Sequence, residues 1–256
     1  MTALIAPAGI AGLELLSSAL QGRGYAVLSP ELVAQGIGCS LVDLQTLNLF
    51  WNDLATDTYL KDGGRYRKRR HACFLVDGAA VTQAPHRAHW QPVEYNALHG
   101  GMQRWFEPIS PQFVNAPAWQ KLLVWLARVS SDCAKVGGPG AQSAPWFVEA
   151  HQFRIDTTDG IGRPTPEGAH RDGVDFVAVF MVDRFNIKGG ETRVFDAAGT
   201  SGERFTLTQP WSLLLLDDAK VIHESTPIQP LEINPHKGGH RDTLVVTLRA
   251  GGFQGA

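Results

Sequence analysis

The sequence predicts an α+β fold that is mostly β, with helices in the first part of the chain and a sandwich or barrel of strands in the second. Up to about residue 145, apolar residues recur at helical spacing, whereas from Trp146 onward short apolar segments alternate with turns rich in Gly, Pro, Asp and Asn. The 256 residues contain no repeat and no convincing linker. We therefore expect a single domain, with helical and mixed support over 1–145 and a β core over 146–256.

Charge and cysteine content restrict the class of protein. The 25 acidic and 23 basic residues give a net charge of −2, which favours neither nucleic acid nor a membrane surface as a partner. Cys39, Cys73 and Cys133 are odd in number and widely spaced, as is typical of a reducing compartment. The N-terminus lacks the basic region of a signal peptide, and no apolar run approaches the roughly 18 residues that span a bilayer. We expect a cytoplasmic protein.

Helix signals concentrate before residue 135. Residues 10–22 read as a short helix, followed by a strand at 25–28. Ser29 precedes a first-turn proline, and Ser40 precedes Asp43 by three residues, so each serine is expected to cap a helix. The strongest apolar stripe at helical spacing predicts a helix over 115–133.

Residues 63–76 predict a strand that begins in a run of basic side chains. This run could bind nucleic acid, or it could form a solvated strand whose arginines pair with acids elsewhere. We favour the second interpretation because Tyr66 is the only aromatic residue interleaved with the charges. The following segment, 77–115, is irregular and long enough to close over a site.

Closely spaced strand candidates make up the second half of the chain. They cover residues 146–155, 174–182, 191–196, 203–208, 212–217, 220–224 and 242–249.

A metal-binding pattern lies between two of these strands. In an extended chain His170 and Asp172 point to the same side, and His223 stands at the end of another apolar strand. Two histidines and one carboxylate leave three adjacent positions open on octahedral Fe(II). Zinc would prefer a closed tetrahedron, often with cysteine, and no cysteine is near in sequence.

The last strand begins with a candidate anion anchor. A dicarboxylate cosubstrate needs a buried guanidinium, and a hydroxyl two residues later adds a hydrogen bond on the same face. Arg241 and Thr243 meet this requirement, with Arg249 as the alternative arginine.

Other histidine pairs do not have a helical context. His86 and His89 lie three residues apart, and His236 and His240 four apart, in segments rich in Pro and Gly. We expect all four to be surface histidines.

Several stretches of the sequence carry a family resemblance, which covers the chain from about Gly63. The stretches are Asp62–Arg70, Glu94–Gly101, Val148–Arg154, Pro164–Gly173, Gly189–Thr192 and His223–Ser225. On these stretches the chain resembles the iron(II)- and 2-oxoglutarate-dependent dioxygenases, and more narrowly the bacterial, isoleucine dioxygenase-like branch that hydroxylates free aliphatic L-amino acids.

The resemblance implies a jelly-roll core, a double-stranded β-helix, with supporting helices. It implies that His170, Asp172 and His223 bind Fe(II), that Arg241 anchors 2-oxoglutarate, and that O2 is consumed with release of succinate and CO2. Because the acidic ligand is present, we do not expect a halogenase. The candidate substrate-binding residues are Gln152, Arg154, Glu167 and Arg171.

Within this set Glu167 is the preferred partner for a substrate amine. The oxidation would be a hydroxylation or, for a thioether, a sulfoxidation. Two alternatives remain open from the sequence: a hydroxylase of peptide or protein side chains, and a non-catalytic, cupin-like metal-binding protein. The sequence predicts neither the amino acid nor the oligomeric state.

Overall fold

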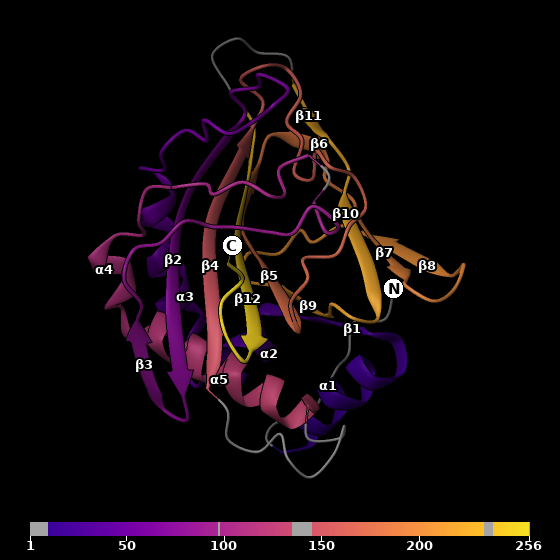
Figure 1. Cartoon of the computed structure of the whole chain (residues 1–256). Helices are drawn as coiled ribbons and strands as arrows, with labels where there is room; N and C mark the ends of the chain where they lie inside the picture. Colours follow the sequence, from indigo (N-terminus) through magenta and orange to yellow (C-terminus); the bar gives the residue numbers. More distant parts are fainter. Residues whose placement is uncertain (1–9, 97, 135–144, 233–237, 256) are drawn as a thin grey trace.

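A seven-stranded antiparallel sheet forms the centre of the molecule. The structure is a computed structural model that describes residues 10–96, 98–134, 145–232 and 238–255. The strand order is β1-β9-β5-β12-β4-β2-β3, so strands from both halves of the chain share one sheet (Figure 1). Its strands are β1 (Tyr25–Leu28), β2 (Arg67–Asp77), β3 (Ala80–Gln83), β4 (Trp146–Asp156), β5 (Phe176–Phe185), β9 (Leu213–Asp217) and β12 (His240–Ala250).

Two smaller sheets complete the β structure. One has the order β10-β7-β8 and the other pairs β11 with β6. Their strands are β6 (Ile187–Gly189), β7 (Thr192–Asp196), β8 (Gly202–Phe205), β10 (Val221–Ser225) and β11 (Ile228–Pro230). This mostly β architecture with a few helices is consistent with the expected jelly roll.

Helices cover one face of the large sheet, seen at the bottom of Figure 1. Trp119 and Leu122 of the longest helix are fully buried in one apolar cluster with Phe74, Val148 and Phe180 of the sheet. The helical segments are α1 (Ile10–Arg23), α2 (Pro30–Ile37), α3 (Leu41–Gln45), the 3-10 turn η1 (Thr46–Trp51), α4 (Pro111–Val114) and α5 (Pro117–Ala134).

Side chains on the opposite face of the sheet alternate with those that contact the helices. Across β2, β4 and β12 they form rows, since Arg67 pairs with Ile155 and Ile155 with Arg241. Four residues further along, His71 pairs with His151, and His151 with Val245. The rows of this face point toward the smaller sheets and the 85–110 segment. Because this face of the sheet carries buried polar side chains such as Arg67, His71 and His151, we interpret it as a binding face.

Most of the expected elements are present. Ser29 and Ser40 cap α2 and α3, and the seven expected strands appear within a few residues of the predicted bounds. The short elements β3, β6, β11 and α4 were not predicted, because three or four residues carry too little periodicity. No helix among the described residues is long and apolar enough to cross a bilayer. Cys39, Cys73 and Cys133 are all free.

One difference concerns the segment before β5. The strand expected from 174 begins at Phe176, so His170 and Asp172 lie in a loop. His170 is nonetheless extended, because it pairs with His223 through hydrogen bonds of 3.0 and 2.9 Å between their backbone N and O atoms.

Candidate active site

The structure brings His170, Asp172 and His223 together. Nε2 of His170 lies 3.8 Å from Oδ1 of Asp172, and Nε2 of His223 lies 3.7 Å from Oδ2 of the same carboxylate. All three potential ligand atoms lie within 4.8 Å of one another. The Nδ1 atom of His170 is 2.9 Å from the Gly168 carbonyl, which orients the ring as second-sphere carbonyls do at metal sites. Burial lowers the pKa of His223 to about 3, so this ring is neutral, as a metal ligand must be.

Asp218 holds the loop that carries this group. Its carboxylate accepts hydrogen bonds from the backbone N–H groups of Asp172, Gly173 and Val174 at 2.9, 2.8 and 3.2 Å. Burial, and then the charge of Asp172, raise the pKa of Asp218 to about 6. Sequence reasoning missed this residue because its partners are backbone atoms 44 to 46 positions away.

The 85–110 segment also contacts the acidic residue of this group. Gln91 donates from Nε2 to Oδ1 of Asp172 at 3.0 Å. Its Oε1 atom accepts from Asn96 and from Nη2 of Arg104, each at 3.0 Å. The segment expected to close over a site therefore contributes to its wall.

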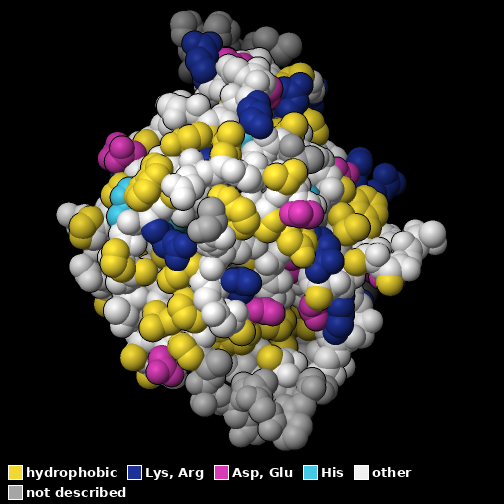
Figure 2. Space-filling view, viewed as in Figure 1, with side chains coloured by type: hydrophobic (Ala, Val, Ile, Leu, Met, Phe, Trp, Pro, Cys, Tyr) yellow, Lys and Arg dark blue, Asp and Glu magenta, His cyan; other side chains and the backbone are white. Residues whose placement is uncertain are grey.

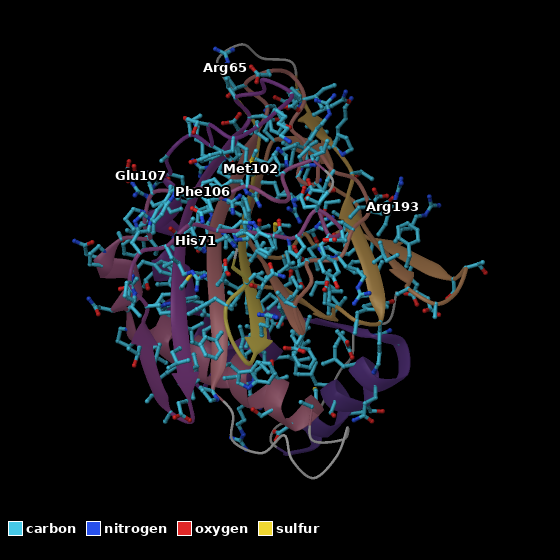
Figure 3. The ribbon with its side chains drawn as sticks, in the orientation of Figure 1. Arg65, His71, Met102, Phe106, Glu107 and Arg193 are labelled. Carbon is cyan, nitrogen blue, oxygen red and sulfur yellow. The ribbon has the colours of Figure 1, made fainter. Side chains whose placement is uncertain are left out.

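A cavity of about 130 Å³ opens beside these residues, between the large sheet and the surrounding loops. Its apolar walls include Phe153, Ile155, Val174, Val179 and Val245. Figure 3 shows His71 and Phe106 within the body of the molecule near β2, whereas Arg65 and Arg193 lie at its periphery. On the face viewed in Figure 2, acidic and basic side chains are interspersed, in line with the small net charge.

Arg241 and Thr243 both line the cavity and are buried. No described carboxylate lies within 4.0 Å of the Arg241 guanidinium, and its Nε atom has no hydrogen-bond partner there. Burial, with a smaller effect of Arg184, lowers its pKa to about 10, and the cation has no counterion among the described residues. Arg249 instead donates to the Gly252 carbonyl at 2.9 Å and is not part of the cavity lining.

Of the four substrate-binding candidates, the structure brings Glu167 alone to the cavity. Gln152 and Arg154 lie on the opposite face of β4 from His151 and Phe153, because neighbouring residues of a strand point to opposite sides.

Two of these residues have other partners. Arg154 forms a two-bond pair with Asp242 at 2.8 and 2.6 Å. Arg171 donates to the Asp218 carbonyl at 2.6 Å.

The interpretation of the basic strand needs a correction. Arg67 does pair with an acid, Asp57, at 2.7 Å, but Arg67 and Arg69 are buried and face the cavity. The Arg69 guanidinium lies between two rings, 3.7 Å from the centroid of Phe106 and 4.3 Å from that of Phe153. The strand is therefore not a solvated one. Only the second half of the strand carries a signal of its faces, because Ala72, Phe74 and Val76 alternate there and face the helices, whereas Lys68 and Arg70 interrupt the pattern in the first half.

Arg104 is a further cavity residue that sequence reasoning missed. It is 2% exposed, and no described carboxylate lies within 4.0 Å of it. Burial lowers its pKa to about 10, and its Nε atom has no partner among the described residues. It carries no sequence signal because the segment around it is irregular.

A second histidine–carboxylate group consists of His71, His89, Glu149 and His151, and all four side chains are buried. The expectation that His89 is a surface residue is therefore wrong: its ring is packed against His151 and bonded to Glu149.

The other paired histidines differ. His86 is exposed, as expected, and its ring is bonded to the Phe106 carbonyl at 2.9 Å, whereas His240 is half-buried and pairs with Asp183 at 2.9 Å. His236 lies outside the described residues.

The fold and the histidine–carboxylate groups are those of a non-haem iron oxygenase, and comparison with known proteins agrees with this class. A family model described as 2OG-Fe dioxygenase matches residues 48–247, and the chain belongs to this family. It is therefore an oxygenase that uses Fe(II), 2-oxoglutarate and O2. No curated protein matches the sequence.

Solved structures extend the comparison. A bsmA homolog from Methylobium petroleophilum PM1 is 50% identical with a TM-score of 0.89, covering 99% of this chain and 97% of that one. IDO from Bacillus thuringiensis is 19% identical with a TM-score of 0.74, over 94% and 100% of the two chains. The Fe(II)/(alpha)ketoglutarate-dependent dioxygenase TqaL is 21% identical with a TM-score of 0.67, over 93% and 87%. The last two show a shared fold.

Proposed function

We propose that this protein oxidises a free L-amino acid at an aliphatic carbon or a thioether, with conversion of 2-oxoglutarate to succinate and CO2. The single observation that carries the proposal is the charge pattern of the cavity. It contains a buried carboxylate oxygen of Glu167 and a buried guanidinium nitrogen of Arg104, and neither atom has a hydrogen-bond partner in the described parts of the chain. A free amino acid presents the complementary ammonium and carboxylate.

Glu167 is suited to the ammonium group. Its Oε2 atom is buried and has no hydrogen-bond partner among the described residues. Its Oε1 atom lies 3.6 Å from Nε2 of His170, so an ammonium bound here is held beside the metal group. Leaving such an oxygen unpaired costs about 1–3 kcal/mol or more, which a bound cation offsets.

Charge balance favours a substrate without net charge. The part of the cavity around Arg104 contains Arg67, Arg69 and Arg104, and the acids close to them are Asp57, Glu149 and Glu167. Three positive and three negative groups balance, and a zwitterion preserves that balance.

We assign the iron to His170, Asp172 and His223 rather than to the second histidine–carboxylate group. In the second group Arg69 donates to Nδ1 of His151 at 2.7 Å. The neutral ring then carries its proton on Nε2 and has no free lone pair for a metal, and a guanidinium this close disfavours a divalent cation. In the first group, no described arginine is bonded to either histidine ring, and Nε2 of both rings is directed to the carboxylate of Asp172.

The remaining roles follow from position. Bound Fe(II) supplies the chemistry that activates O2 with 2-oxoglutarate. Arg241, with Thr243, holds the far carboxylate of 2-oxoglutarate. Phe153, Ile155 and the valines of the cavity exclude water around the carbon to be oxidised.

The test is a screen of the twenty amino acids with Fe(II), 2-oxoglutarate and ascorbate, with succinate and a +16 mass shift as readouts. We expect at least one free amino acid to give both. The Asp172→Ala variant should lose turnover and bind Fe(II) more weakly, measured as bound iron per chain. Full activity or full iron content in this variant would contradict the assignment of the ligands.

The same screen separates the alternatives. A cavity enclosed by charged side chains suits a small molecule better than an extended peptide. Succinate formation with peptides but with no free amino acid would indicate a peptide hydroxylase. No succinate with any substrate would favour a non-catalytic protein. The cytoplasmic location expected from the cysteine content is part of this proposal.

A further inference from the structure

The second histidine–carboxylate group contains two separate sets of hydrogen bonds beside the cavity, one centred on Glu149 and one between Arg69 and His151. Oε2 of Glu149 is 3.1 Å from Nε2 of His71 and 2.8 Å from Nδ1 of His89. Nη2 of Arg69 is 2.7 Å from Nδ1 of His151. Glu149, His89 and His151 line the cavity, and His71 lies behind them.

These contacts fix which ring nitrogens carry protons. A carboxylate oxygen only accepts, so His71 and His89 each donate an N–H to Glu149. Burial lowers the pKa of His89 to about 4, so this ring is neutral and its Nε2 atom is left as an acceptor. Arg69 only donates, so Nδ1 of His151 accepts and its Nε2 atom carries a proton.

The cavity therefore receives a defined set of polar atoms. His89 offers an acceptor at Nε2, His151 offers an N–H donor at Nε2, and Glu149 offers an acceptor at Oε1. None of these three atoms has a hydrogen-bond partner among the described residues. A buried group of this kind costs several kcal/mol of desolvation free energy, which apolar side chains would avoid.

This polar set is distinct from the cosubstrate anchor. His151 pairs with Val245 in the sheet, four residues along β12 from Arg241. At about 3.3 Å per residue the two rows are roughly 13 Å apart. The five-carbon chain of 2-oxoglutarate spans about 6 Å between its carboxylates, and its other end is directed to the metal. The polar set is thus available to a different molecule.

We propose that these three side chains recognise the side-chain carboxamide of the amino acid substrate. A carboxamide NH2 has two hydrogens for Nε2 of His89 and Oε1 of Glu149, and its C=O accepts from Nε2 of His151. The inference rests on the proposed function and narrows its substrate class to asparagine, glutamine and close analogues.

Charged side chains fit less well. A carboxylate has no hydrogen to give to His89 or Glu149 and would be repelled by the latter. An ammonium or guanidinium group cannot accept a hydrogen bond from His151, and the positive charges of Arg69 and Arg104 nearby repel it. A substrate with an aliphatic side chain leaves all three polar atoms unpaired. A site built to hydrogen-bond its substrate rejects such an analogue strongly, because its buried polar atoms then lose their partners.

The test is equilibrium binding of amino acids to the Fe(II)- and 2-oxoglutarate-loaded protein without O2, by calorimetry, followed by turnover with O2. Asparagine and leucine are the matched pair, because they have nearly the same shape and differ in the carboxamide. We expect asparagine or glutamine to bind at least about 100-fold more tightly than leucine.

Failure of this inference differs from failure of the proposed function. Tighter binding and turnover of leucine or isoleucine, of aspartate, or of lysine would overturn the carboxamide assignment and leave amino acid oxidation intact. Absence of binding and of turnover for every amino acid would overturn both.

Substitution of individual cavity residues tests whether they recognise the carboxamide. His89→Leu and His151→Leu should each reduce the asparagine-to-leucine affinity ratio by at least about tenfold, whereas His86→Leu, outside the cavity lining, should leave it unchanged. If thermal unfolding shows that a leucine variant does not fold, Glu149→Gln is used in its place. This variant should also reduce the asparagine-to-leucine affinity ratio. An unchanged ratio in all folded variants would contradict the assignment.

Discussion

Gln91 links Arg104 to the carboxylate of Asp172, which we propose as an iron ligand. It donates to Asp172 and accepts from Arg104, both at 3.0 Å, and it is itself buried. A carboxylate ligand that is oriented by such a neighbour binds its metal more tightly, and loss of the neighbour costs about 10- to 100-fold in metal affinity or activity.

We therefore predict that Gln91→Ala weakens Fe(II) binding by about tenfold or more, measured by titration of the metal-free protein. Asn96→Ala keeps the Gln91–Asp172 bond and should have a smaller effect. Metal affinity equal to that of the wild type in Gln91→Ala would show that Asp172 needs no such partner.

Arg241 and Arg249 provide a matched pair on one strand. Arg241 faces the cavity and has no described acid as a counterion, whereas Arg249 bonds to the Gly252 carbonyl outside it. We predict that Arg241→Ala raises the KM for 2-oxoglutarate by about 100-fold, because a charge-assisted pair is worth roughly 2–3 kcal/mol or more. Arg249→Ala should leave this KM within about twofold. The reverse result would move the anchor to Arg249.

At the scale of elements, short helices depend on their caps. Ser40 and Asp43 form a reciprocal capping box at the start of α3, with bonds of 2.8 Å from the Ser40 N–H and 3.1 Å from the Asp43 N–H. The bond between the two side chains contributes to the lowering of the Asp43 pKa. A five-residue helix has few internal hydrogen bonds, so the cap supplies much of its stability.

Ser40→Ala should accordingly lower the free energy of unfolding by about 1 kcal/mol, measured by urea denaturation, with kcat unchanged. Thr82→Ala, on the short edge strand β3, is a suitable surface control. A loss of activity in Ser40→Ala at unchanged stability would indicate that α3 affects the site directly.

At the scale of the whole molecule, the buried histidine–carboxylate group links folding stability to pH. Burial lowers the pKa of His89 to about 4, below its unfolded value of about 6.5. The folded state therefore binds fewer protons than the unfolded state between these values, and stability falls as pH drops from about 6.5 to 4. The lowered pKa of Glu149 acts in the same direction at lower pH, because hydrogen bonds from His71 and His89 stabilise its charged form more than burial disfavours it.

We predict that the free energy of unfolding decreases by about 3 kcal/mol between pH 7 and pH 4 from His89 alone. The His89→Gln variant should show a correspondingly flatter pH dependence. Equal slopes for the two proteins in urea titrations at several pH values would argue against a buried neutral His89.

The sequence by itself determined the local elements and the residues whose chemistry is distinctive. Caps at Ser29 and Ser40, the apolar stripe of α5 and the alternating strands depend on neighbours within a few positions, so they could be predicted. His170, Asp172 and His223 could be proposed as a group because two of them lie in one short segment and the third ends a recognisable strand.

Only the tertiary structure decided which side chains share the cavity. Arg67, Arg69, Arg104, Glu149 and Asp218 meet the site from four separate parts of the chain, and local pattern does not encode which face of a sheet is covered by helices. The same uncertainty about faces led Gln152 and Arg154 to be considered for the substrate site. Register between distant strands fixes these faces, because a shift of one residue turns every side chain to the other side.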